Sequence, residues 1–323
     1  MIISRAPFRI SLFGGGTDLP AFYEQNGRGA VVSFSIKKYM YIIIHPYFHD
    51  KIRMKYSKTE DVDKADQLEH PLARECLKKF NVRAGLEIAS IADIPSGTGL
   101  GSSSAFTVGM LGALTKYSGG DCDQASIAEW AAKIEIYNLK QPIGKQDHYG
   151  SAIGGLKHIE FLKNGTVKVD QLPSGRAEII LENILLFYVG IPRSAISILQ
   201  EQSKNMSSPK EYLVAKNLLD ISDASKQIIL NGDLQNLGEL LHESWECKKK
   251  LSLGISNPYI DHIYDKGMKN GALGAKLLGA GGGGFMLFYC PVDRQMELRH
   301  SMQGLKELKV ELDLDGVSII HNE

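Results

Sequence analysis

The stretch from Pro95 to Ala105 constrains the fold more than any other part of the chain. It reads Pro-Ser-Gly-Thr-Gly-Leu-Gly-Ser-Ser-Ser-Ala, and an apolar run without proline follows it to Leu114. Glycine lets the backbone approach a ligand closely and adopt dihedral angles that other residues avoid. The apolar run predicts a buried helix over residues 102–117. Because the first N–H groups of a helix lack partners within it, a glycine-rich loop that opens into a helix is typical of a phosphate-binding site.

The same stretch has an ordinary alternative interpretation, which is a flexible loop with a serine as helix N-cap. It is not a Walker A loop, since no Gly-Lys-Ser/Thr follows the glycines. Two further motifs, at residues 6–18 and 276–285, favour the phosphate-binding interpretation over the flexible loop.

Composition excludes several classes of protein. A length of 323 residues with 43% hydrophobic residues predicts a folded globular chain of about two domains. Lys plus Arg and Asp plus Glu both number 37, so no net charge attracts nucleic acid or an anionic membrane. No apolar run is long enough to span a bilayer, and the first residues lack the apolar core of a signal peptide. The four cysteines are scattered without a Cys-x-x-Cys, so we expect a cytoplasmic protein with reduced thiols.

The N-terminal motif is a predicted strand that ends in three glycines, followed by Thr17 and Asp18. Arg9 lies within this strand, and its permanently charged guanidinium suits a phosphate or a carboxylate. Taken singly, Arg9 and Asp18 would be ordinary as a surface ion pair and a turn residue.

The last motif, residues 276–285, contains four consecutive glycines, Gly281 to Gly284. Gly279, Gly281 and Gly284 satisfy the dinucleotide-binding pattern G-x-G-x-x-G. An apolar strand follows at residues 285–290, where that pattern requires a helix, so we interpret the run as a tight turn between two strands.

These three stretches, in this order, resemble the three motifs of the GHMP kinases, the family of galactokinase, homoserine kinase, mevalonate kinase and phosphomevalonate kinase. The resemblance implies an α+β fold of two domains, with an N-terminal ATP-binding domain over residues 1–185. A ferredoxin-like C-terminal domain over residues 186–323 and an active site in the cleft between the two domains are also implied. It further implies ATP and Mg²⁺, with the nucleotide phosphates held by Ser96, Gly97, Gly99, Leu100, Gly101, Ser102, Ser103 and Ser104.

The resemblance also implies roles for single residues. Asp147, expected in a loop, would meet the acceptor hydroxyl, and Arg9 would lie near the transferred phosphoryl group. Ser103, with Ser104 as the alternative serine, would hold Mg²⁺ together with Glu135, which lies on a predicted helix over residues 122–139. The ordinary alternatives are a solvated helix charge for Glu135 and a loop residue for Asp147, and we expect the neighbouring His148 to be structural. The implied substrate-binding residues are Gly15, Gly16, Thr17, Asp18, Gly281 and Gly282.

The glycines at positions 14–16 bear on the substrate. Galactokinases have Gly-Glu-His-Thr-Asp where this chain has Gly-Gly-Gly-Thr-Asp, and the loss of the Glu-His pair speaks against galactose. The local motif is similar to that of the bacterial D-glycero-D-manno-heptose 7-phosphate kinases. This similarity implies phosphorylation of the anomeric hydroxyl to a 1,7-bisphosphate, for nucleotide-activated heptose and surface polysaccharide.

Two alternatives to the heptose phosphate kinase remain, and several basic residues are candidates for binding the substrate's phosphate. The chain could be another anomeric sugar kinase of the fucokinase type, or a non-catalytic sugar sensor on the same fold. The substrate's own phosphate could be bound by Lys145, by Arg193, or by one of the lysines at 248–250, which otherwise predict a solvated helix face.

Overall fold

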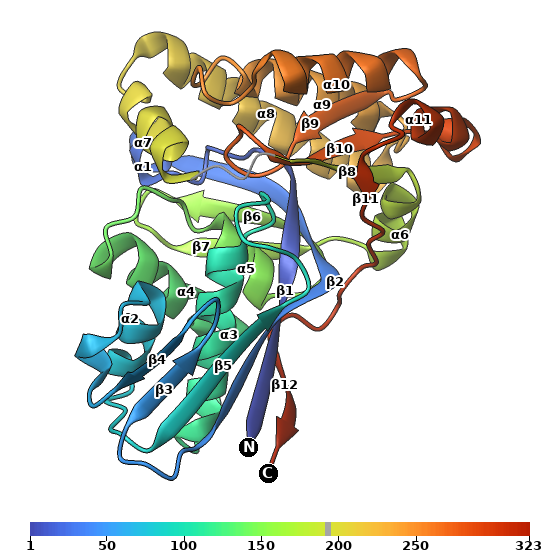
Figure 1. The fold of residues 1–323 in the computed structure, drawn as a ribbon. Helices are drawn as coiled ribbons and strands as arrows, with labels where there is room; N and C mark the ends of the chain where they lie inside the picture. Colours follow the sequence, from blue (N-terminus) through green and yellow to red (C-terminus); the bar gives the residue numbers. More distant parts are fainter. Residues whose placement is uncertain (191–194) are drawn as a thin grey trace.

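Two β-sheets organise the chain, of which a computed structural model describes residues 1–190 and 195–323. The larger sheet has eight strands in the order β12-β1-β2-β5-β3-β4, with β6 and β7 continuing from β2, and the smaller has the order β11-β8-β10-β9. In Figure 1, helices α3, α4 and α5 lie with the larger sheet, and α8, α9 and α10 lie with the smaller one. The two-domain α+β architecture expected from the sequence is confirmed.

Strand β2 (Arg28–Pro46) is the spine of the larger sheet. One of its edges pairs with β1, while the other pairs with β6 along residues 28–34 and with β5 along residues 40–46. The sequence predicted two strands here, but Lys37 and Lys38 form a bulge that keeps the strand continuous. The other strands of the sheet are β1 (Ile2–Phe13), β3 (Ile52–Lys55), β4 (Thr59–Val62), β5 (Leu86–Ala92), β6 (Leu156–Leu162), β7 (Val167–Gln171) and β12 (Ser318–Asn322).

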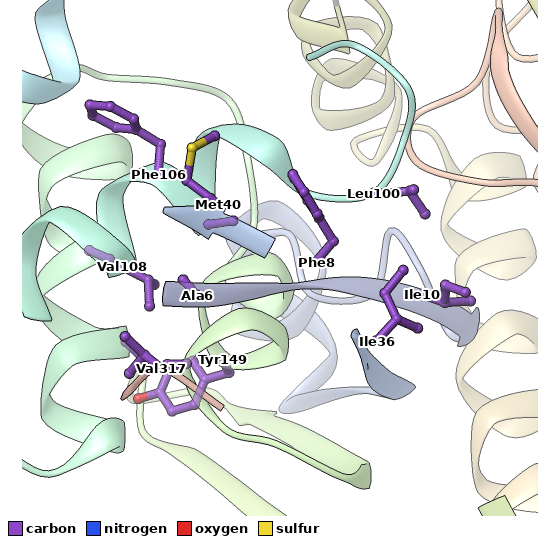
Figure 2. Packing of buried hydrophobic residues seen from close by; sticks show 14 of the residues in the cluster. Ala6, Phe8, Ile10, Ile36, Met40, Leu100, Phe106, Val108, Tyr149 and Val317 are labelled. Carbon is purple, nitrogen blue, oxygen red and sulfur yellow. The ribbon is translucent and has the colours of Figure 1, made fainter. Parts of the chain in front are cut away.

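Helix α3 (Ser102–Tyr117) packs against β1 and β2, and 13 of its 16 residues are buried, as its uniformly apolar sequence predicted. Figure 2 shows Val108 of this helix beside Ala6 of β1. The remaining helices of this domain are α1 (Pro20–Asn26), α2 (Pro71–Lys79), α4 (Gln124–Ala132), α5 (Gln146–Ala152) and a short 3₁₀ turn (Ala65–Gln67).

The predicted helix over residues 122–139 is interrupted, because α4 ends at Ala132 and a π-helical turn (Lys133–Asn138) carries the chain onward. The following segment, predicted as a loop, contains α5. Short helices with glycine and serine lack apolar periodicity. Here Gly150 lets Arg9 pack closely against the helix, since a β-carbon would lie 3.0 Å from Arg9 Cγ. Asp147 therefore lies in the first turn of a helix rather than in a loop.

The smaller sheet begins with β8 (Ile184–Gly190), so the predicted division at residue 185 falls within its first strand. A division by residue number also assigns β12, the last strand, to the second domain. This strand instead pairs with β1 in the larger sheet. The other elements of this half are α6 (Ser174–Glu182), α7 (Ala195–Asn205), α8 (Pro209–Asn231), α9 (Asn236–Lys248), α10 (Pro258–Lys269), β9 (Gly274–Leu277), β10 (Gly284–Tyr289), a 3₁₀ turn (Val292–Arg294), α11 (Gln295–Ser301) and β11 (Lys306–Glu307).

The glycine motifs of the two domains touch each other. A β-carbon on Gly99 would lie 2.4 Å from Leu278 O, and one on Gly279 would lie 2.5 Å from Gly99 Cα. Phe285 N donates a hydrogen bond to Thr98 O across the same contact, at 3.2 Å. Glycine is required at both positions, since both also have left-handed backbone angles, with φ of +85° and +74°.

Candidate active site

A cavity of about 920 Å³ is lined by residues of both domains and contains most of the residues singled out from the sequence. One part has an apolar and aromatic wall, formed by Met40, Tyr56, His70, Leu72 and Phe106. The other part is polar and charged, with contributions from β1, α5, α7, α9 and β9. A volume of this size is ample for a nucleotide with a small second ligand.

The Gly/Ser loop lies between the two parts of the cavity. Gly97, Gly99 and Gly101 all have positive φ, at +76°, +85° and +81°, and Gly101 immediately precedes α3. The residues that line the cavity are Ser96, Gly97, Gly99, Gly101, Ser102 and Ser103. The other two predicted members do not: Leu100 is fully buried, with its carbonyl accepting a hydrogen bond from Arg9 N, and Ser104 is buried in the same helix. The loop thus directs the α3 N-terminus, a favourable place for phosphate, into the cavity.

Arg9 and Asp147 form an ion pair beside this loop. Arg9 Nε and Nη2 lie 2.9 and 2.7 Å from Asp147 Oδ1, and Arg9 Nη1 donates to Gly99 O at 2.7 Å. The Arg9 side chain is 4% exposed and the Asp147 side chain 28%, so the carboxylate faces the cavity while the guanidinium supports it from behind. A carboxylate held this way can accept a proton or a hydrogen bond from a hydroxyl group.

Asp18 is the second carboxylate of the cavity and is almost fully buried. Its Oδ1 accepts hydrogen bonds from Gly16 N at 3.1 Å and from Gln146 Nε2 at 2.9 Å. Gly144 lies against the carboxylate, where a β-carbon would come within 2.0 Å of Asp18 Oδ2. Burial, together with the nearby Asp147 carboxylate, raises the pKa of Asp18 to about 6.

The remaining predicted substrate-binding residues divide into two groups. Gly15 and Gly16 line the cavity, as expected. Thr17 does not, because its hydroxyl holds the turn through contacts with Gly14 O, Ala30 O and Ala30 N. Gly281 and Gly282 do not line it either: they pack against Ile255, and the cavity is lined instead by Gly279 and Ala280 of the same turn.

Glu135 is fully buried in the π-helical turn and does not itself line the cavity. Its Oε1 accepts a hydrogen bond from Thr107 Oγ1 at 2.8 Å and lies 3.1 Å from His148 Nε2. Thr107 Oγ1 also lies 3.0 Å from Ser103 O, so Thr107 connects Glu135 to the first turn of α3, where Ser103 lies. Within the described residues, Glu135 Oε2 has no hydrogen-bond partner. His148 is itself fully buried beside Glu135, and the structural role expected for it stays a prediction.

The basic residues considered for phosphate binding lie in different places. Lys145 is buried away from the cavity, where its Nζ pairs with Glu129 at 2.7 Å and donates to Gly165 O at 2.9 Å. Arg193 lies outside the described residues. Lys248 lines the cavity and is 7% exposed, so the expectation that residues 248–250 form one solvated face is wrong for this lysine.

Sequence reasoning missed Lys276 and did not separate Lys248 from its two neighbouring lysines. Lys276 lines the cavity, and its Nζ donates to Ser11 O at 3.0 Å and to Leu12 O at 2.7 Å. Burial, with Lys248 and Arg9 nearby, lowers the pKa of Lys276 well below its usual range. Lys248 carried a usable signal, because it follows Leu241 and Trp245 at helical spacing and therefore shares their buried face.

Models of known protein families match one segment in each half of the chain. Residues 70–155 match the model of the GHMP kinases N terminal domain, and residues 225–302 match that of the GHMP kinases C terminal domain. Within the part of the chain that the structure describes, no helix combines the length and apolar character needed to cross a membrane.

Three similar proteins cover nearly the whole chain. D-glycero-alpha-D-manno-heptose 7-phosphate kinase of Campylobacter jejuni is 27% identical, covering 92% of this chain and 91% of that protein. L-fucokinase/L-fucose-1-P guanylyltransferase of Bacteroides fragilis is 29% identical over 93% of this chain, which spans 35% of that longer protein. The structure of a D-glycero-D-manno-heptose 1-phosphate kinase from Bacteroides thetaiotaomicron has the same fold, with a TM-score of 0.80 at 21% identity and full coverage of both chains.

Proposed function

Because this chain belongs to the GHMP kinases, which are ATP-dependent phosphotransferases, we propose that it phosphorylates the anomeric hydroxyl of D-glycero-D-manno-heptose 7-phosphate. The product is the 1,7-bisphosphate, a precursor suited to nucleotide activation of the heptose for surface polysaccharide. The observation that carries the proposal is the Arg9–Asp147 pair next to the Gly/Ser loop, in a cavity whose polar part contains Asp18 and two buried lysines.

The residues of the cavity divide the reaction between them. The α3 N-terminus and the Gly/Ser loop hold the phosphates of ATP, and the apolar wall receives the base. Asp147 orients the acceptor hydroxyl and takes its proton, while Arg9 fixes the carboxylate and offsets negative charge at the transferred phosphoryl group. Most of the rate enhancement comes from positioning and charge neutralisation, as in phosphoryl transfer generally.

Mg²⁺ fits the region between Ser103 and Glu135. The unpartnered and buried Glu135 Oε2 is an oxygen ligand of the kind Mg²⁺ takes, and Ser103 lines the cavity one turn of α3 before Thr107, which bonds to Glu135. When bound with ATP, the ion would neutralise phosphate charge. No cluster of three or more His, Cys, Asp or Glu side chains suited to a metal occurs among the described residues, so phosphate oxygens and water would complete the coordination.

A polyhydroxyl acceptor fits the polar part of the cavity. Asp18 and Gln146 present a carboxylate and an amide side by side, and Gly15 and Gly16 leave room for a ring. Sugar hydroxyls can donate to the carboxylate and accept from the amide. These groups favour a sugar in general, and the buried lysines favour one that carries a phosphate.

A panel of acceptors tests the proposal. ADP release is measured with heptose 7-phosphate, unphosphorylated heptose, L-fucose and galactose, and ³¹P NMR identifies the phosphorylated position of each product. We expect the highest kcat/KM with heptose 7-phosphate and an anomeric phosphate in its product. A higher kcat/KM with L-fucose, or a phosphate at a non-anomeric position, would overturn it. The similarity to the Bacteroides fragilis fucokinase makes L-fucose the sharpest competitor.

A further inference from the structure

Lys248 is the last residue of α9 and is the one lysine of its run that turns into the cavity. Its neighbour Lys249 pairs with Glu246 on the outside of the helix, at 2.7 Å. Lys248 Nζ instead donates to Gly279 O in the glycine turn of the second domain. Its ammonium group therefore lies in the same cavity as Arg9, Asp18 and Asp147 without being paired to either carboxylate at hydrogen-bond distance among the described residues.

Among the buried cations that line the cavity, Lys248 makes the fewest hydrogen bonds to the described residues. An ammonium has three donors, and the described residues accept one of them. Lys276 donates to two backbone carbonyls, while Arg9 is paired with Asp147 and also donates to Gly99 O. Burying a charge without a partner is costly. A binding partner with negative charge would offset that cost.

The electrostatic surroundings agree with this requirement. Burial and the nearby Arg9 guanidinium lower the pKa of Lys248 to about 8. The Asp18 and Asp147 carboxylates oppose the shift from a distance. A bound phosphate would stabilise the charged ammonium, because opposite charges in a partly dry cavity attract strongly.

Gln202 of α7 is a second incompletely bonded group in the same cavity wall. Its side chain is buried, and Nε2 has no hydrogen-bond partner among the described residues. Helix α7 is held to the segment after α9 by Asn205 Nδ2, which donates to Leu251 O at 3.0 Å. Both Gln202 and Leu251 face Gly16, within about 4 Å of the position its β-carbon would take. Gln202 and Lys248 therefore belong to neighbouring elements on one side of the cavity.

We propose that Lys248, with Gln202 of the same cavity lining as a neutral hydrogen-bond donor, binds a phosphate group in the cavity. The inference rests on the proposed function and deepens it, because two phosphates meet in such a site. One is the acceptor sugar's own phosphate, and the other is the terminal phosphate of ATP during its transfer. Both offer the anionic oxygens that an ammonium and an amide bind.

The test compares Lys248→Met, which keeps length without charge, with Lys248→Arg and with the surface control Lys249→Met. Binding of inorganic phosphate, of Mg²⁺ with a non-hydrolysable ATP analogue, and of heptose 7-phosphate is measured by calorimetry. Turnover is measured with heptose 7-phosphate and with unphosphorylated heptose. We expect Lys248→Met to weaken inorganic phosphate binding about tenfold or more, since hydrogen bonds to charged groups contribute on the order of 1.5–3 kcal/mol. Lys248→Arg should restore part of the loss.

The two sources of phosphate give different patterns. If Lys248 binds the acceptor's own phosphate, Lys248→Met raises KM for heptose 7-phosphate and leaves KM for unphosphorylated heptose unchanged. If it binds the transferred phosphate, kcat falls with both acceptors and the ATP analogue binds more weakly. Phosphate binding and kinetics in Lys248→Met within twofold of Lys249→Met would overturn the inference.

The melting temperature distinguishes phosphate binding by Lys248 from a role in folding, and the binding measurements distinguish it from the choice of sugar. A lysine that served only to hold the fold would lower the melting temperature when removed. Removal of a buried charge without an anionic partner should leave the melting temperature equal or higher. If heptose 7-phosphate is not a substrate at all, the inorganic phosphate and ATP-analogue measurements still decide the role of Lys248.

Discussion

Arg9 and Asp147 form one unit, because two guanidinium nitrogens contact the same carboxylate oxygen. The guanidinium is held by Gly99 O and by packing against Gly101 and Gly150, where β-carbons would lie 3.3 and 3.0 Å from Arg9 Cγ. Its two contacts with one oxygen of Asp147 leave the second oxygen available to a ligand. The Arg9 side chain is therefore positioned by a backbone carbonyl and by the close approach of two glycines, rather than by a long polar network.

Asp147→Asn tests the proton-accepting role. The amide keeps size and part of the hydrogen bonding, but it cannot take a proton. We expect kcat to fall about 100-fold or more, as is typical for loss of a positioned base, with ATP affinity measured by calorimetry largely retained. Asp121→Asn is the matched control, since the Asp121 side chain is 90% exposed and pairs with Lys116 outside the cavity. A folded Asp147→Asn enzyme with kcat within about threefold of this control would remove Asp147 from its role.

Asp18 gives the acceptor site a pH dependence. Its pKa of about 6 lies above the ordinary value of 3.8, so it is ionised above pH 6 and becomes protonated as the pH falls through 6. A neutral carboxyl is a weaker acceptor for sugar hydroxyls, so KM for the sugar should rise about tenfold between pH 7.5 and pH 5, while KM for ATP changes less. Initial rates across this range check the expectation.

Asp18→Asn is the control for that profile, because a sugar phosphate also changes its charge near pH 6. The variant keeps acceptors for Gly16 N and Gln146 Nε2 but has no proton to gain. Its KM for the sugar should be high at all pH values and vary only as the substrate phosphate titrates. An identical pH dependence in wild type and variant would assign the whole effect to the substrate.

At the scale of elements, helix α3 links the phosphate loop to the buried Glu135. Thr107, one turn after Ser103, lies within hydrogen-bond distance of both Ser103 O and Glu135 Oε1. The helix therefore presents its N-terminus to the cavity and, one turn later, carries the hydroxyl that fixes the carboxylate. Because α3 is buried on nearly all sides, this spacing is rigid.

Glu135→Gln tests whether that carboxylate serves a metal. The amide oxygen can still accept from Thr107, so we expect the melting temperature to change little. Loss of the charge should raise the Mg²⁺ concentration for half-maximal rate several-fold, because Mg²⁺ prefers anionic oxygen ligands. Glu178→Gln, on the exposed face of α6, is the control. Unchanged Mg²⁺ dependence, with a lowered melting temperature, would make Glu135 a structural partner of His148 instead.

The sequence predicted α3 and the two glycine motifs well, because each is a continuous signal: an all-apolar run, alternate glycines, and a turn between two apolar strands. It failed at α5 and at the π-helical turn, since their conformations depend on contacts with Arg9, Thr107 and His148 that lie far away in the chain. Thr17 shows the same limit, because a threonine after glycines has no local mark that says whether its hydroxyl holds the turn or faces the cavity. Lys248 differs, since its helical spacing from Leu241 and Trp245 places it on the buried face of α9.

At the scale of the whole molecule, the cavity depends on the contact between Gly99 and Gly279. Gly279→Ala should lower the melting temperature and raise KM for both substrates, because the methyl group would separate the domains at this point. Gly119→Ala is the matched control, since Gly119 also has φ of +74° and has no atom within 4 Å of the β-carbon position. Both variants carry about 1–2 kcal/mol of backbone strain, so any difference between them reports the contact itself. Equal melting temperatures and equal KM values would contradict this account.

Strand β12 also determines the order in which the chain can acquire its structure during synthesis. Ile2 of β1 pairs with Asn322, so the larger sheet closes only after everything between them has left the ribosome. The second domain can form its own sheet before that closure, because its four strands lie between residues 184 and 307. Figure 1 shows the two ends of the chain meeting at the base of the larger sheet. The half made first is thus the half finished last, and residues 2–5 of β1 keep one edge unpaired until β12 has been made.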